Sequence, residues 1–107
     1  MSAILSKSNK KDKKYMLKHD NKTIHFGANG MRDFTLINKP SSSFYISNKE
    51  DREKVKKNYR SRHQKDPINK KFSPASLSWY LLWNKTTLGA SIKDYEKRFN
   101  VNIINKT

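Results

Sequence analysis

The residues with the clearest chemical potential in this chain are the bases between positions 54 and 65. They end in the run Arg60-Ser61-Arg62-His63-Gln64-Lys65. On a helix, such cations can contact the phosphates of nucleic acid nonspecifically or enter a major groove. An ordinary solvated helix face is the alternative interpretation. The candidate contact residues here are Lys54, Lys56, Lys57, Arg60, Arg62, His63 and Lys65.

A second basic segment lies at the start of the chain. Residues 1–14 hold five lysines and one aspartate, and they show no apolar periodicity. This composition predicts a basic flexible arm that precedes a single small domain over residues 15–107. The arm would either lie along phosphates or remain a solvated tail. Its candidate contact residues are Lys10, Lys11, Lys13 and Lys14.

The three histidines, His19, His25 and His63, lack the spacing of a metal site, and the chain has no cysteine. His19 and His25 could face each other across a hairpin, but two histidines alone make a poor zinc site. We therefore expect no metal and no other cofactor.

Groups that could catalyse a reaction are also sparse. The acidic side chains show no paired arrangement for general acid and base catalysis, so we expect a non-enzymatic protein, with a small nuclease as a weaker alternative. Gly27-x-x-Gly30 lacks the context of a phosphate-binding loop and is interpreted as a turn. Trp79 and Trp83 could form a base-stacking platform, but a role in the core is favoured because few other residues are apolar.

Composition bounds the kind of protein. The 107 residues carry 24 Lys and Arg against 9 Asp and Glu, a net charge of +15. A charge of this size favours a polyanionic partner, because neutralising phosphates releases counterions. The alternative source of part of the charge is an AT-rich genome, since the chain also holds 19 Lys and 11 Asn. No apolar run approaches the roughly 20 residues of a membrane span, and no signal peptide is evident. We expect no secretion, no membrane contact and no small-molecule substrate.

The elements expected to position these residues define an α+β fold. Three short strands over 15–19, 23–26 and 33–37 would form an antiparallel meander, with an Asp20-Asn21 turn between the first two. About three helices would follow. The first would run from Asn48 to Gln64 with Ser47 as its cap, and the others would begin at Ser73-Pro74 and at Ser91. The tail 101–104 would form a strand or pack on the core. The expected core residues are Phe26, Phe34, Leu77, Tyr80, Leu81, Trp83, Ile92, Tyr95 and Phe99.

Several colinear segments between residues 14 and 99 resemble a family of short basic proteins of unassigned function from large nucleocytoplasmic DNA viruses, the giant viruses of algae and protists. The matching segments are Lys14-Tyr15-Met16, residues 22–28, Gly30 with Asp33-Phe34-Thr35, Tyr59-x-x-Arg62-His63, residues 81–85 and residues 91–94. The serine-rich loop 41–43 departs from the family pattern. The resemblance implies a viral origin and a virion-associated role, and it supplies no reaction and no site residues.

These observations favour a nucleic-acid-binding protein that contacts phosphates with little sequence specificity, with DNA preferred over RNA as the partner. Other virion proteins are further candidate partners. The alternative is a minor structural protein of the capsid or core. In either case we expect the protein in the virion or in the cytoplasm or nucleus of the host.

Overall fold

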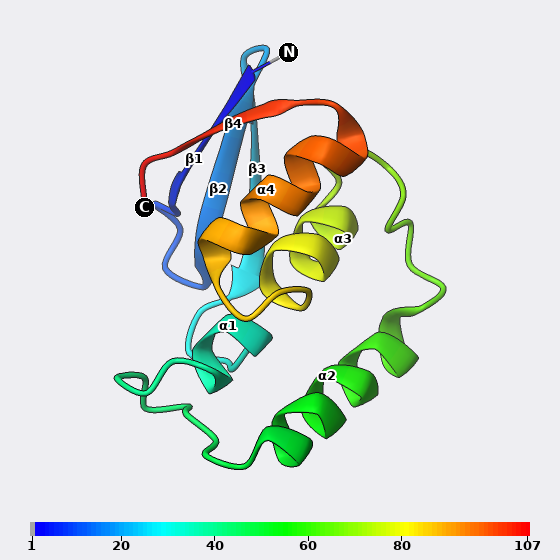
Figure 1. The fold of residues 1–107 in the computed structure, drawn as a ribbon. Coiled ribbons are helices and arrows are strands. Elements are labelled where there is room, and N and C mark those ends of the chain that lie inside the picture. Colours follow the sequence, from blue (N-terminus) through cyan, green and yellow to red (C-terminus); the bar gives the residue numbers. More distant parts are fainter. Residues whose placement is uncertain (1) are drawn as a thin grey trace.

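The computed structural model describes residues 2–107 and combines a four-stranded sheet with helices (Figure 1). The strands lie side by side in the order β3-β2-β1-β4. The pairs β1–β2 and β2–β3 are antiparallel, whereas β4 runs parallel to β1. The predicted α+β class and the N-terminal antiparallel meander are confirmed. The strand bounds are Ser2–Lys7 for β1, Lys13–His19 for β2, Lys22–Ala28 for β3 and Asn102–Asn105 for β4.

The β2–β3 hairpin forms where the sequence predicts it. Asp20 and Asn21 adopt left-handed backbone angles, with φ of 46° and 63°, which these two residue types tolerate in tight turns. The turn sets a register in which Leu17 lies opposite Ile24. Leu17 is fully buried by this arrangement.

The expectation of a flexible arm over residues 1–14 is wrong for the described part of that segment, and Met1 lies outside the described residues. Residues 2–7 form β1, an interior strand between β2 and β4. Its alternate residues Ala3 and Leu5 are buried, and Ala3 lies opposite Ile103 in the parallel pair. The burial of these few apolar side chains stabilises β1. The lysines that follow it made the whole segment look like a flexible arm in the sequence.

The third predicted strand, over 33–37, is also wrong, because this segment contains the short helix α1, Phe34–Ile37. Asp33 caps the helix, and its Oδ1 accepts a hydrogen bond from the Leu36 backbone N–H at 3.1 Å. Both Phe34 and Ile37 are buried, as their three-residue spacing on one helical face allows. The third strand of the meander is therefore β1.

The helices that follow α1 lie close to their predicted positions. Helix α2 spans Lys49–His63, and its N-cap is Asn48, one residue beyond the predicted Ser47 cap. Helix α3, Pro74–Leu77, has the predicted Ser73 cap and leads directly into a turn of π-helix, η1, Ser78–Leu82. Helix α4 spans Leu88–Phe99 and begins three residues before the predicted Ser91, because Thr87 supplies its cap.

The core lies between the sheet and the layer formed by α3, η1 and α4 (Figure 1). Eight of the nine predicted core residues are buried, and Phe99 is partly buried against them. Trp79 and Trp83 retain only 8% and 7% of their exposure, so the prediction that they belong to the core is confirmed. Helix α2 lies outside this layer (Figure 1), and its Val55 and Tyr59 pack against the core.

Candidate nucleic-acid interface

Helix α2 carries most of the predicted contact residues, and it has no fully buried residue. Its first turn contains the acids Glu50 and Asp51, and its last turn contains Arg60, Arg62 and His63, an arrangement that suits the helix dipole. One side of the helix is half-buried through Val55, Lys56 and Tyr59, while the opposite side is exposed. The helix thus separates two sets of cations with different environments.

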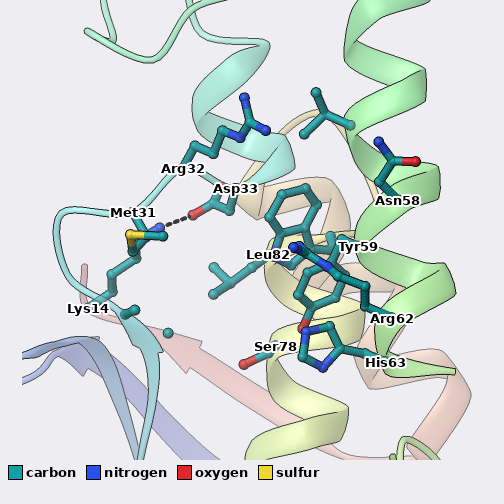
Figure 2. Close-up of a pocket in the computed structure, with 14 residues that line it drawn as sticks. Lys14, Met31, Arg32, Asp33, Asn58, Tyr59, Arg62, His63, Ser78 and Leu82 are labelled. Carbon is teal, nitrogen blue, oxygen red and sulfur yellow. Dashed lines mark hydrogen bonds and ion pairs between the residues drawn. The ribbon is translucent and has the colours of Figure 1, made fainter. Parts of the chain in front are cut away.

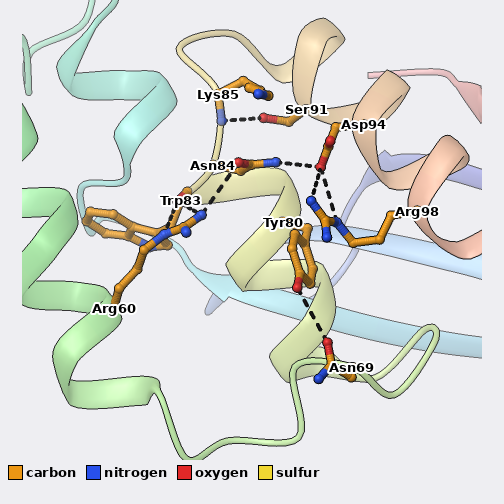
Figure 3. Close-up of polar contacts among 9 residues, drawn as sticks. All are labelled: Arg60, Asn69, Tyr80, Trp83, Asn84, Lys85, Ser91, Asp94 and Arg98. Carbon is orange, nitrogen blue, oxygen red and sulfur yellow. Dashed lines mark hydrogen bonds and ion pairs between the residues drawn. The ribbon is translucent and has the colours of Figure 1, made fainter.

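Arg60 belongs to the half-buried side and makes specific contacts there. Its Nε and Nη2 donate hydrogen bonds of 3.2 Å and 3.0 Å to the Trp83 carbonyl oxygen (Figure 3). Its guanidinium also lies 4.7 Å from the centroid of the Trp79 ring. Burial lowers the pKa of Arg60, although an arginine stays charged at neutral pH. Arg60 therefore fastens α2 to the end of η1.

Lys56 acts in the same way one turn earlier. Its Nζ donates a 2.7 Å hydrogen bond to the Asn84 carbonyl oxygen and lies 4.7 Å from the centroid of the Phe34 ring. Burial, and then the charge of Arg60, lowers the pKa of Lys56. The carbonyls at a helix C-terminus lack intrahelical partners and attract cations. Both half-buried cations thus have their charged groups bonded to protein carbonyl oxygens.

His63 ends the half-buried side within a column of stacked rings. Its ring centroid lies 4.4 Å from that of Tyr59, which lies 4.3 Å from that of Trp83 at an interplanar angle of 6°. Two rings cannot share one face of Tyr59 at these distances, so Tyr59 lies between them. His63 Nδ1 also lies 2.8 Å from Asp66 Oδ2. Burial, and secondarily the charge of Asp66, raises the pKa of Tyr59 to about 12.

The remaining predicted cations of this region form the exposed surface of α2 and the turn after it. They are exposed to solvent, and within residues 2–107 none of them takes part in an ion pair or a side-chain hydrogen bond. We call this set the exposed α2 cations. They are Lys54, Lys57, Arg62 and Lys65.

The other predicted contact residues lie at the β1–β2 connection. Lys10 and Lys11 are exposed and Lys13 is half-buried. Asn29 fastens this turn through a 3.1 Å hydrogen bond from its Nδ2 to the Lys11 carbonyl oxygen. The lysines are thus held by a defined turn, which we call the lysine turn, residues 8–13.

Lys14 differs from its neighbours because its charge is paired inside the protein. Its Nζ lies 2.6 Å from Asp33 Oδ2, and the two side chains are 11% and 2% exposed. The same carboxylate caps α1. The pair joins β2 to the start of α1, so Lys14 stabilises the fold and is not a free surface cation.

A pocket of about 460 Å³ lies between the β3–α1 connection and α2 (Figure 2). Arg32 and Met31 lie on the side of the connection, while Arg62 and His63 come from α2 (Figure 2). Sequence reasoning missed Met31 and Arg32, because an isolated methionine and arginine in a loop carry no pattern. Further lining residues include Lys14, Asp33, Val55, Asn58, Tyr59, Ser78, Leu82 and Trp83.

A second, more open groove of about 690 Å³ adjoins the first. It shares Lys14 and Met31 with the pocket, and it is lined by the lysine turn and by Lys7. The two hollows therefore bring Arg62 and His63, at the end of α2, near the lysine turn, although these segments lie far apart in the sequence.

The structure places the two histidines of the β2–β3 hairpin, His19 and His25, apart from each other. His19 lies opposite Lys22 and His25 opposite Met16, so these histidines do not face each other across the hairpin. In residues 2–107, no group of three or more His, Cys, Asp or Glu side chains could hold a metal ion.

Gly27 and Gly30 have φ of 77° and 82°, which confirms the predicted turn.

Comparison with known proteins gives one match. The model of a family of unknown function, DUF5754, matches residues 3–41, a segment that covers β1 from Ala3 onward and all of β2, β3 and α1. No curated protein and no solved structure matches the chain. Among the described residues, no helix has the length and apolar character to cross a membrane.

Proposed function

We propose that this protein binds nucleic acid without catalysing a reaction, through phosphate contacts that have little sequence specificity. The exposed α2 cations carry the proposal, because all four are solvent-exposed while Lys56 and Arg60 hold the helix that presents them. A rigid helix that offers unpaired cations on one side is suited to a row of phosphates.

Geometry and charge both support phosphate binding. Lys54 and Arg62 are eight residues apart, which corresponds to about 12 Å along a helix axis. One DNA strand places a phosphate every ~3.4 Å along its axis, so the helix can meet several phosphates at once. Each contact would also relieve part of the self-repulsion of a chain with net charge +15.

The low specificity follows from the kinds of side chain on this surface. Three of the four exposed α2 cations are lysines, which bind as mobile point charges and not as the planar fork of arginine. The lysine turn adds further lysines. DNA is the favoured partner. The resemblance to giant-virus proteins supports a place in the virion or in the host cytoplasm or nucleus as part of the same proposal.

Binding to a labelled DNA duplex, followed by fluorescence anisotropy at about 50 mM salt, tests this function. We expect dissociation constants in the micromolar range that characterises nonspecific binding. The absence of binding at this salt concentration would refute the proposal. Recovery of the protein in stoichiometric amounts from genome-free capsid shells would instead favour the structural role in the virion.

A further inference from the structure

The pocket between the β3–α1 connection and α2 combines anion-binding and apolar groups. Arg32 and Arg62 are exposed cations on its two sides (Figure 2). The one carboxylate in its lining, that of Asp33, is already paired with Lys14 at 2.6 Å. The two arginines are therefore free to bind an anion from the ligand.

The apolar groups of the pocket suit a planar ligand. Met31 is 61% exposed, which is unusual for a large apolar side chain, and its flexible thioether can adapt to a flat surface. Across the pocket, His63 is the outer ring of the stacked column with Tyr59, and its side chain is 40% exposed. A nucleobase can extend such a column, since every base has an aromatic face.

Size and position restrict the ligand further. A volume of about 460 Å³ lies within the range of small-ligand pockets and accommodates a single nucleotide. The bases of a duplex are stacked and paired, so only an unpaired nucleotide could enter. The adjoining groove, reached past Lys14 and Met31, places the lysine turn where neighbouring phosphates of the same strand would run.

We infer that this pocket binds one unpaired nucleotide of single-stranded DNA, with its base between Met31 and His63 and its phosphate at Arg32 and Arg62. This inference rests on the proposed function and makes it more specific. The strand would pass from the exposed α2 cations, through the pocket, to the lysine turn. The protein would then prefer single strands to duplexes.

The test compares a labelled thymidine oligonucleotide with a duplex of equal length at one salt concentration. We expect the protein to bind the single strand about tenfold more tightly, the effect of one stacked base. Met31→Ala should reduce single-strand affinity several-fold without changing duplex affinity, because Met31 carries no charge and its exposure makes the substitution benign for folding. Arg32→Gln should also weaken single-strand binding more than duplex binding.

Lys93→Gln serves as the matched control, since it removes one exposed positive charge from α4, away from the pocket. It should change both affinities equally and slightly. Equal affinity for the two DNA forms, with Met31→Ala and Arg32→Gln affecting both alike, would overturn the inference and leave phosphate binding intact. Binding to neither form would instead refute the proposed function itself.

A free nucleotide shares the chemistry of the strand, so competition with thymidine monophosphate distinguishes the two sources. We expect the monophosphate to compete far more weakly than the oligonucleotide, because it cannot reach the lysine turn or the exposed α2 cations. Equal competition by the two compounds, mole for mole, would assign the pocket to a free nucleotide and overturn the inference.

Discussion

The guanidinium of Arg60 donates two hydrogen bonds to the carbonyl oxygen of Trp83, from Nε at 3.2 Å and from Nη2 at 3.0 Å. Trp83 belongs to the core, whereas Arg60 belongs to a helix that has no fully buried residue. The position of α2 therefore depends on polar and aromatic contacts more than on apolar burial. Arg60, although it lies among the basic residues of α2, therefore positions the helix that carries the exposed α2 cations.

Arg60→Ala should lower the free energy of unfolding by about 2 kcal/mol, because it removes charge-assisted hydrogen bonds and a cation–π contact. Arg60→Lys should restore only part of this loss, since lysine lacks the planar fork. Urea denaturation measures both. Lys57→Ala is the control, because Lys57 is exposed on the same helix. Equal effects of Arg60→Ala and Lys57→Ala would contradict the fastening role.

The buried pair of Lys14 and Asp33 predicts strong coupling. Lys14→Met leaves the Asp33 carboxylate buried and unpaired, so we expect a loss of about 3 kcal/mol in unfolding free energy. The double variant Lys14→Met with Asp33→Asn should regain much of that loss, because no unpaired charge remains. A double-mutant cycle measures the coupling. Lys18→Met, at an exposed position of the same strand, should change stability by less than about 0.5 kcal/mol. Additive effects in the cycle would argue against the pair.

Gly27 closes the wall of the pocket in a backbone conformation that other residues rarely adopt. Its φ is 77°, and an added Cβ would lie 2.9 Å from Leu82 Cδ1. Gly27→Ala should therefore lower the free energy of unfolding by more than about 1 kcal/mol, and with it the melting temperature. Gly89→Ala provides the opposite case, because Gly89 lies in α4 with open space around it and should gain up to about 1 kcal/mol. Similar melting temperatures for the two variants would contradict this assignment.

The raised pKa of Tyr59 leads us to expect a loss of stability in alkaline solution. Burial first, and then Asp66, raises its pKa from 10.0 to about 12. Between these values the unfolded chain releases the phenol proton while the folded chain retains it, so stability falls as pH rises. Below the lower value both states are protonated, and Tyr59 adds no pH dependence. Urea denaturation across this range should show a smaller decline for Tyr59→Phe than for the unmodified protein. Identical declines would show that Tyr59 is not shielded as described.

The features that local sequence determines were predictable. The Asp20-Asn21 turn and the Ser73 cap depend on neighbouring residues alone, and both lie where their patterns indicate. The core could be predicted because the chain has few large apolar residues, so most of them are needed inside. Trp79 and Trp83 illustrate this reasoning.

The features that distant contacts determine were not predictable. Strand β1 depends on Ala3 pairing with Ile103, near the opposite end of the chain. In the same way, Lys56 and Arg60 bond carbonyl groups more than twenty residues away. Helix α2 has so few apolar residues that its sequence pattern does not indicate which side faces the rest of the protein. Lys56 and Arg60 are therefore candidate contact residues in the sequence, whereas in the fold they bond the carbonyl oxygens of Asn84 and Trp83.

The salt dependence of DNA affinity tests the central claim most directly. The logarithm of the association constant should fall linearly with the logarithm of salt concentration, with a slope set by the number of phosphates contacted. Replacing Lys54, Lys57 and Arg62 together by glutamine should reduce the magnitude of that slope by about 3. A triple variant on α4 and the C-terminal tail, with Lys93, Lys97 and Lys106 changed to glutamine, removes the same exposed charge and should leave the slope almost unchanged. Equal reductions for the two triple variants would contradict a specific binding surface on α2.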